Sequence, residues 1–356
     1  MIKDIVEKIE MIAKKEAENR RSILSQIELL YDDITNENLH LKFIEIRNED
    51  VRDHIACGVD GSKYEVELED VTIVLAKSVI VEGDYTSRRA VPKHLKEDFK
   101  ILGNHYGKVN ITNSSTLLML DLETNMLEKC EECNVIFIDG PIIEPPYYNS
   151  NEIKIEGFPN FNDLVKYRAK IIKKLKNTKN IIGIVKNFYH RFLINLLVDE
   201  GYRKLMHARE SYLVNNLFMK YRNENKYQGT LLLGIINWDD VKQKIKLSDL
   251  EFLLDVYLKY KNEDMSISVS SLYFQLNTIS PIVRIDLIRS SSDEEIISQL
   301  NYVKVWSVSG IREVTLLTKL ADEYSSITSK DAENYIKLFK LFYNSEYNKN
   351  INILKV

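Results

Sequence analysis

The chain has 356 residues with a net charge of -4 and a pI of about 6.0, so it is not a simple basic nucleic-acid-binding domain. Its hydrophobic content of 44% is enough for a large core. No stretch approaches the roughly 20 apolar residues of a membrane span, and the charged N-terminus is unlike a signal peptide. The three cysteines are too few for a disulfide framework and indicate a reducing compartment. We therefore expect a cytoplasmic protein without a membrane segment.

The first segment, residues 2–30, predicts a long amphipathic helix, because apolar residues recur at helical spacing from Ile2 to Ala13. Such a stripe faces either the protein's own core or a partner surface. Residues 53–62 and 70–82 predict two strands, the second rich in β-branched residues. Only a short polar stretch separates them, so we expect a hairpin.

The middle of the chain is less regular. Residues 84–114 show no clear periodicity and are basic, with aromatic residues interleaved. A helix is predicted over 115–130 and a buried strand over 134–139. Residues 140–160 contain four of the chain's six prolines, so we expect a loop there.

The second half alternates between predicted helices and strands. A basic helix over 161–177 precedes a buried strand at 181–186. Further helices are predicted at 190–200, 208–222, 246–259, 293–302, 312–324 and 329–343, and strands at 229–236, 266–275 and 281–288.

An antiparallel opening followed by strand–helix alternation predicts an α/β fold, a mixed sheet flanked by helices. The ribonuclease-H-like fold is one such architecture, with acidic residues on a central strand, a neighbouring strand and a helix. We expect a single domain over 1–356. It would comprise an N-terminal helical arm (1–50), a ribonuclease-H-like core (51–290) and C-terminal helices (291–356).

Two aspartates end predicted strands, and each is followed by glycine. Asp60 stands in Gly-Val-Asp-Gly-Ser-Lys and Asp139 in Phe-Ile-Asp-Gly-Pro. Asp60 shares its strand face with the small residues Ala56 and Gly58, so another segment could approach the backbone there. The simpler alternative is an Asp-Gly turn for Asp60. A carboxylate at the end of a buried strand, such as Asp139, is either a turn residue or a site residue.

Glu123 lies on the predicted 115–130 helix among apolar neighbours. Burying an unpaired carboxylate costs several kcal/mol, so Glu123 needs a partner, either a metal ion or an Arg or Lys. Carboxylates from two strand ends and a helix suit hard divalent cations. Two such cations about 4 Å apart can hold a phosphodiester for in-line attack by water. Together, Asp60, Glu123 and Asp139 favour a metal-dependent nuclease.

Other motifs are less specific. Lys186 closes the strand at 181–186, as either a solvated lysine or a phosphate contact beside the acidic residues. Cys130-Glu-Glu-Cys133 resembles half a zinc site, but a four-cysteine site is impossible and no closely spaced histidine pair exists, so we expect no zinc. No P-loop and no G-x-S-x-G motif is present. A basic cluster is either a solvated helix face or a track for a nucleic-acid backbone: Lys166, Arg168, Lys170, Lys173, Lys174, Lys176 and Lys179.

The order and spacing of these motifs resemble the archaeal DNA-repair nuclease family NurA. The pieces are Gly-Val-Asp60-Gly-Ser-Lys, Glu123 on a helix, Val-Ile-Phe-Ile-Asp139-Gly-Pro and Gly-Ile-Val-Lys186. The resemblance implies a ribonuclease-H-like homodimer with Mn2+- or Mg2+-dependent digestion of single-stranded and double-stranded DNA. It also implies a partner, the hexameric ATP-driven translocase HerA, and a role in resecting DNA ends at double-strand breaks.

Carried over by position, the resemblance makes Asp60, Glu123 and Asp139 metal ligands. The family also has a tyrosine and a histidine in a C-terminal motif, where this sequence aligns Val314 and Asp322. An aspartate can ligate Mn2+ or Mg2+ through oxygen, but it cannot supply an imidazole for proton transfer. The plain alternative for Asp322 is a polar helix face near Thr315 and Thr318.

Three functional hypotheses follow. The first is an active NurA-type metal-dependent DNA nuclease, with Asp60, Glu123, Asp139, Lys186 and Asp322 at its site. The second is a NurA-like paralogue with weak or no activity that binds DNA or a partner. The third is a ribonuclease-H-like nuclease acting on RNA or on junctions, which the fold alone would permit.

Overall fold

The computed structural model describes residues 2–47, 51–68, 71–104, 108–143, 159–188, 190–243, 248–288, 292–309 and 314–354. The chain forms two compact units, each combining a β-sheet with helices. Unit 1 contains Met1–Arg52, Gly140–Glu144 and Asn180–Leu316, and unit 2 contains Asp53–Asp139, Pro145–Lys179 and Leu317–Val356. Among the described residues, no helix combines the length and the apolar character that crossing a membrane requires.

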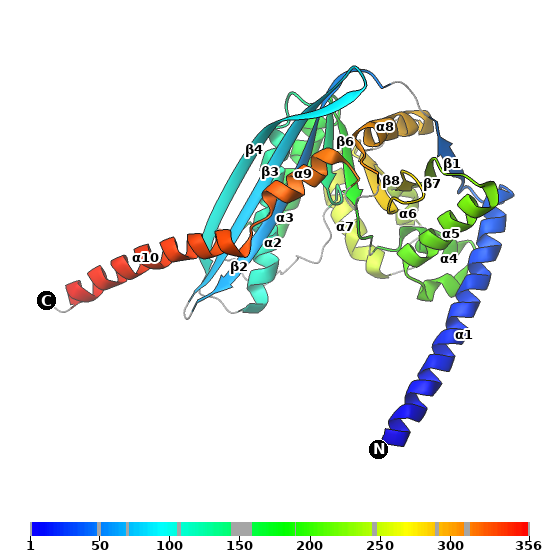
Figure 1. Cartoon of the computed structure of the whole chain (residues 1–356), viewed down its shortest axis with the longest axis horizontal. Helices are drawn as coiled ribbons and strands as arrows, with labels where there is room; N and C mark the ends of the chain where they lie inside the picture. The colour runs from blue at the N-terminus through cyan, green and yellow to red at the C-terminus, as the bar shows by residue number, and fades with distance from the viewer. Residues whose placement is uncertain are drawn as a thin grey trace. The chain divides into compact units, whose positions relative to one another are not determined.

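Unit 1 contains an antiparallel sheet. Its described strands follow the order β1 (Phe43–Ile46), β7 (Thr230–Asn237), β8 (Val269–Gln275), β9 (Val283–Ile288) and β6 (Asn180–Val185). The predicted strand pair at 266–275 and 281–288 is thus confirmed as β8 and β9. The helices of this unit are α1 (Ile2–Thr35), α4 (Phe192–Asp199), α5 (Glu210–Asn225), α6 (Trp238–Gln243), α7 (Ser248–Glu263) and α8 (Asp293–Trp306) (Figure 1).

The long helix α1 has two different halves. Its C-terminal half buries Ile27, Leu30 and Ile34 in unit 1. The apolar stripe of its N-terminal half is exposed, with Ile5 at 51% and Ile9 at 61%. The view that the stripe packs on the protein's own core therefore fails for the N-terminal half, whose apolar face remains available to a partner.

Unit 2 contains a mixed sheet. Strand β2 (His54–Glu67) is parallel to β5 (Val135–Asp139) and antiparallel to β3 (Thr72–Thr86), which confirms the predicted hairpin. Strand β4 (Arg89–Asn104) pairs antiparallel with β3, so a long strand lies within residues 84–114, where the sequence shows no clear periodicity. Charged residues hide the alternation of β4, because two of its lysines pair with acids on β3, Lys93 with Asp84 and Lys96 with Glu82.

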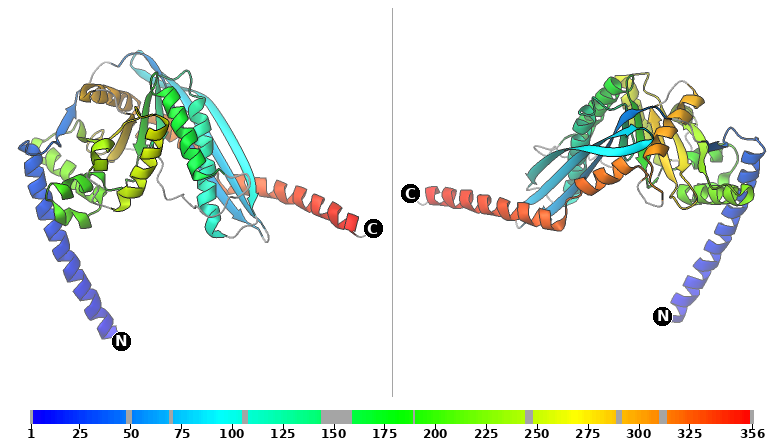
Figure 2. Two further views of the ribbon diagram at one scale, coloured as in Figure 1. Left: turned by 180° about the vertical axis from the view of Figure 1, so that it is seen from behind. Right: turned by 45° about the horizontal axis from the view of Figure 1, so that its top comes forward.

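Helices cover both faces of this sheet. Helices α2 (Lys108–Glu128) and α3 (Phe161–Leu175) lie on one face, and α9 (Leu316–Ser325) and α10 (Ser329–Leu354) lie on the other (Figures 1 and 2). Side chains of β3 alternate between two cores: Val74 packs with Leu118 of α2, and Ile73 with Ala332 of α10. The predicted α/β fold with a mixed sheet flanked by helices is therefore confirmed.

Candidate metal centre

Two glycines of strand β2 face two different helices, Gly58 facing α9 and Gly61 facing α2. A Cβ atom added at Gly58 would lie 2.4 Å from the carbonyl carbon of Leu317 at the start of α9. A Cβ atom at Gly61 would lie 2.8 Å from Oε1 of Glu123 on α2. Because side chains alternate along a strand, Asp60 shares the α9 face with Gly58. The segment expected to approach the backbone at Gly58 is therefore α9.

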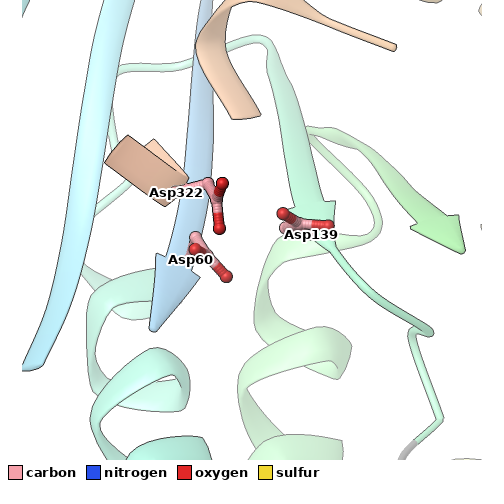
Figure 3. A group of neighbouring side chains, drawn as sticks. All are labelled: Asp60, Asp139 and Asp322. Atoms are coloured by element: carbon pink, nitrogen blue, oxygen red, sulfur yellow. The ribbon is translucent and has the colours of Figure 1, made fainter. Parts of the chain in front are cut away.

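Three aspartates meet beside this contact. Each of Asp60, Asp139 and Asp322 offers a carboxylate oxygen, and these three oxygens all lie within 4.8 Å of one another (Figure 3). Strands β2 and β5 are parallel with Val59 opposite Ile138, so Asp60 and Asp139 are the next residues on the two strands, at the point where their pairing ends. Helix α9 brings Asp322 to them. The structure thus unites Asp139, at the end of β5, with Asp322 and with Asp60, which lies within β2 and not at its end as predicted.

A serine that the sequence analysis missed fastens α9 to β2. The Ser325 hydroxyl donates a hydrogen bond of 2.9 Å to Oδ2 of Asp60, and the Ser62 hydroxyl donates to the Ser325 carbonyl. The backbone of β2 at Gly58 also contacts the start of α9. The helix is therefore held against β2 on both sides of Asp322. Ser325 lies three residues after Asp322, on the same helix face, which is the signal that could have identified it.

Burial and repulsion between the carboxylates both raise the pKa of Asp60. Asp60 is only 8% exposed, and burial is the main cause that raises its pKa to about 7. The charges of Asp139 and Asp322 raise this pKa further, while hydrogen bonds from Ser325 and the Gly61 N–H lower it. A cation would relieve the repulsion, and carboxylate oxygens are the donors that Mg2+ and Mn2+ prefer. The residues present therefore fit a divalent metal.

Glu123 lies on the α2 face of β2, where its partner is an arginine. It is 5% exposed, and its Oε2 lies 3.8 Å from Nη1 of Arg168, which is fully buried on α3. The expectation that Glu123 needs a partner is met by this ion pair. The prediction that Arg168 belongs to a solvated or nucleic-acid-facing surface is wrong. It falls on the buried stripe of α3 with Leu164, Ala169 and Ile172.

Lys186 belongs to unit 1, directly after β6. It is half-buried and lines a cavity of about 570 Å3 together with Asn187, Arg191, Arg209 and Glu210. Its role as a phosphate contact remains a prediction. Val314, aligned with the family tyrosine, is buried just before α9 and carries no hydroxyl.

The fold and the three-carboxylate cluster define an α/β protein of the ribonuclease-H-like type whose acidic centre is built from β2, β5 and α9. The family model described as the NurA domain matches residues 54–327. The chain therefore belongs to the NurA family. The match includes every member of the cluster.

Solved structures share this fold. The chain is similar to the NurA nuclease from Sulfolobus solfataricus, with a TM-score of 0.63 and 13% identity over 97% of this chain and 98% of that one. It is also similar to NurA bound to dAMP and manganese, with a TM-score of 0.55 and 13% identity over 93% and 95% of the two chains. At such identities the likeness shows the fold alone. No curated protein sequence matches this chain significantly.

Proposed function

We propose that this chain is a Mn2+- or Mg2+-dependent deoxyribonuclease that digests single-stranded and double-stranded DNA ends. The observation that carries this proposal is the meeting of Asp60, Asp139 and Asp322 within 4.8 Å in a NurA-family chain. A related NurA structure contains dAMP and manganese, which supports a deoxynucleotide and a divalent cation as ligands of this centre.

Different residues of the chain would bind the cation, orient a ligand and contact the phosphate. Asp60, Asp139 and Asp322 would hold the cation, and Ser325 would orient the Asp60 carboxylate. A bound divalent cation would activate water and offset charge on the phosphodiester. Glu123 remains a predicted ligand. To act as one, it would have to leave its ion pair with Arg168 and reach past the backbone at Gly61 to the face of β2 that carries Asp60. Lys186 remains a predicted phosphate contact or transition-state cation.

The second candidate function is a NurA-like paralogue with weak or no nuclease activity that binds DNA or a partner. The specific observation in its favour is Asp322, which occupies the cluster in place of the histidine that the family motif leads us to expect. The site then has one more negative charge and no imidazole. It gains an oxygen ligand for a cation and loses a group that exchanges protons near neutral pH.

The decisive experiment is a digestion assay on end-labelled single-stranded DNA with Mn2+. Wild type should release nucleotides, and both EDTA and Asp60→Ala should abolish the release. Glu323→Ala is the matched control, since Glu323 is an exposed acid on α9 outside the cluster. Metal binding without digestion in the wild type would favour the paralogue. Digestion of RNA or junctions in preference to DNA would favour a different ribonuclease-H-like activity.

We further propose a homodimer that acts in double-strand-break repair with a HerA-like hexameric ATPase. The exposed stripe of α1 (Ile5, Val6, Ile9) and the exposed apolar residues of α10 (Leu338, Leu341, Phe342) support a binding surface. Light scattering at micromolar concentration tests the dimer, and co-elution tests the ATPase. A monomer that does not co-elute with a HerA-like protein would contradict this part of the proposal.

A further inference from the structure

The chain's three cysteines gather at one point of unit 2. Cys57 lies on β2, and Cys130 and Cys133 lie in the turn between α2 and β5. All three are fully buried and free. The sulfur atoms of Cys57 and Cys130 are 2.9 Å apart, and Cys133 is hydrogen-bonded to both thiols.

Regular structure holds this cluster in place. Cys57 is on the same face of β2 as Gly61, the face that packs against α2. The Cys130 N–H donates to the Leu127 carbonyl, and the Cys133 N–H donates to the Cys130 carbonyl. Strand β5 begins two residues after Cys133 and pairs with β2, with Cys57 opposite Ile136. The sulfur contact therefore connects two ordered segments.

The contact distance distinguishes two uses of such a cluster. Two sulfurs on one tetrahedral zinc lie about 3.8 Å apart, because each Zn–S bond is about 2.3 Å long. The 2.9 Å between Cys57 and Cys130 is shorter than that, and lies under 1 Å from the roughly 2.05 Å of a disulfide. Direct S–S bonding therefore requires less rearrangement than a shared metal.

The thiols also differ in reactivity. Hydrogen bonds from Cys130 and Cys57, aided by the charges of Lys96 and Lys179, lower the pKa of Cys133 to about 4. Burial raises the pKa of Cys57, and the hydrogen bond with Cys133 raises the pKa of Cys130. A thiolate is the nucleophilic form of cysteine, so the cluster places one nucleophile against two protonated thiols.

We infer that this cluster is an oxidisable thiol centre in which a small hydroperoxide joins Cys57 and Cys130 as a disulfide. Because all three thiols are buried, the reaction begins when the turn between α2 and β5 opens locally and admits the hydroperoxide. The Cys133 thiolate then attacks the peroxide oxygen, forming an S–O bond while the O–O bond breaks and the leaving alkoxide takes a proton from solvent. The Cys130 thiol then attacks the Cys133 sulfur, and the hydroxyl leaves with the Cys130 proton as water. Cys57 finally attacks the Cys130 sulfur, loses its proton to solvent and releases the Cys133 thiolate. In sum, two thiols and one hydroperoxide give one disulfide, one alcohol and one water.

The cross-link would join two positions that are 73 residues apart, tying β2 to the end of α2. Constraining a loop of that length in the unfolded chain raises stability. Asp60 points to the opposite face of β2, so the metal cluster is left in place. This inference is therefore independent of the proposed nuclease function.

The test starts from the reduced, EDTA-treated full chain exposed to hydrogen peroxide. We expect the number of alkylatable thiols in denaturant to fall from three to one, and peptide mapping to find Cys57 linked to Cys130. A reductant should restore all three thiols, and the oxidised protein should melt at a higher temperature. Cys133→Ala should slow the reaction by about tenfold or more, because the thiolate is lost.

Three results would overturn the inference. The first is retention of all three thiols after peroxide treatment. The second is a disulfide between Cys130 and Cys133 as the final product. The third is a tightly held zinc ion, released only when these thiols are alkylated. Because mapping uses the wild-type chain, the conclusion does not depend on whether the Cys133→Ala variant folds.

Discussion

Gly58 on β2 and Leu317 on α9 are in direct backbone contact, and a methyl group at Gly58 would lie 2.4 Å from the Leu317 carbonyl carbon. A side chain at position 58 would collide with the backbone of α9, so the helix can lie this close to β2 because the residue is glycine. Helix α9 carries Asp322, so a glycine on one strand decides whether the third carboxylate reaches the cluster.

Gly58→Ala should therefore displace α9 and weaken metal binding. We expect a loss of stability of about 1–3 kcal/mol, typical of overpacking, and a clear loss of Mn2+ affinity by calorimetry. Gly103→Ala is the control, because its nearest contact would be an ordinary 3.4 Å to the Val71 side chain. Unchanged Mn2+ affinity in the Gly58 variant would show that the helix position does not matter for the site.

Arg168 and Glu123 should be energetically coupled. Arg168→Met leaves the Glu123 carboxylate buried without its cation, which typically costs about 3–5 kcal/mol. The double variant Arg168→Met, Glu123→Gln should recover most of that loss, as chemical denaturation would measure. Mn2+ should rescue the single Arg168 variant if Glu123 can ligate metal. Additive losses in the double variant would exclude the coupling.

Asp322 should limit the rate of catalysis. Loss of a proton-transferring group typically lowers the rate about 10²–10⁴-fold, so Asp322→His should accelerate digestion of labelled DNA. Asp322→Ala should weaken Mn2+ binding, whereas Glu323→Ala on the next position should change neither property. If Asp322→Ala digests DNA as fast as wild type, Asp322 is an ordinary surface residue.

The buried Glu210 should make unit 1 less stable as the pH rises. Burial is the main cause that raises its pKa from 4.5 to about 7, although Tyr273 and the backbone of Ile194 donate hydrogen bonds to it. Because the folded pKa lies above the unfolded one, this stabilising contribution is full below pH 4.5 and is lost as the pH rises to about 7. In Glu210→Gln, the melting temperature should depend less on pH between 4.5 and about 7 than it does in the wild type. An identical pH profile in both proteins would refute this prediction.

The exposed lysines of α3 should contribute to DNA binding through charge. Charge reversal at Lys170 and Lys173, which are both exposed on α3, tests this contribution. Removing one lysine–phosphate interaction should reduce the slope of log affinity against log salt by about one. Titration of labelled DNA at several salt concentrations measures this slope, with Lys8→Glu on α1 as the control. An unchanged slope would mean that α3 presents only a solvated face.

Most elements were predictable from local patterns. Apolar periodicity located α1, the β2–β3 hairpin and α2, because local spacing alone decides which residues can share a face. Strand β4 was missed because cross-strand ion pairs such as Lys77–Glu97 replace the usual alternation. No local signal reports such pairs, since their partner lies on another strand.

The sequence by itself determined that Asp139 ends a strand and that Glu123 needs a buried partner. The prediction that Asp60 also ends its strand is wrong, because β2 continues to Glu67. Strand ends and helix faces are local properties, written in the spacing of apolar residues. Only the tertiary structure decided that Arg168 is that partner, that Ser325 holds Asp60, and that Asp322 joins the cluster. Ser325 is 265 positions from Asp60. Contacts at that separation depend on how α9 packs against β2 at Gly58, which no local pattern encodes.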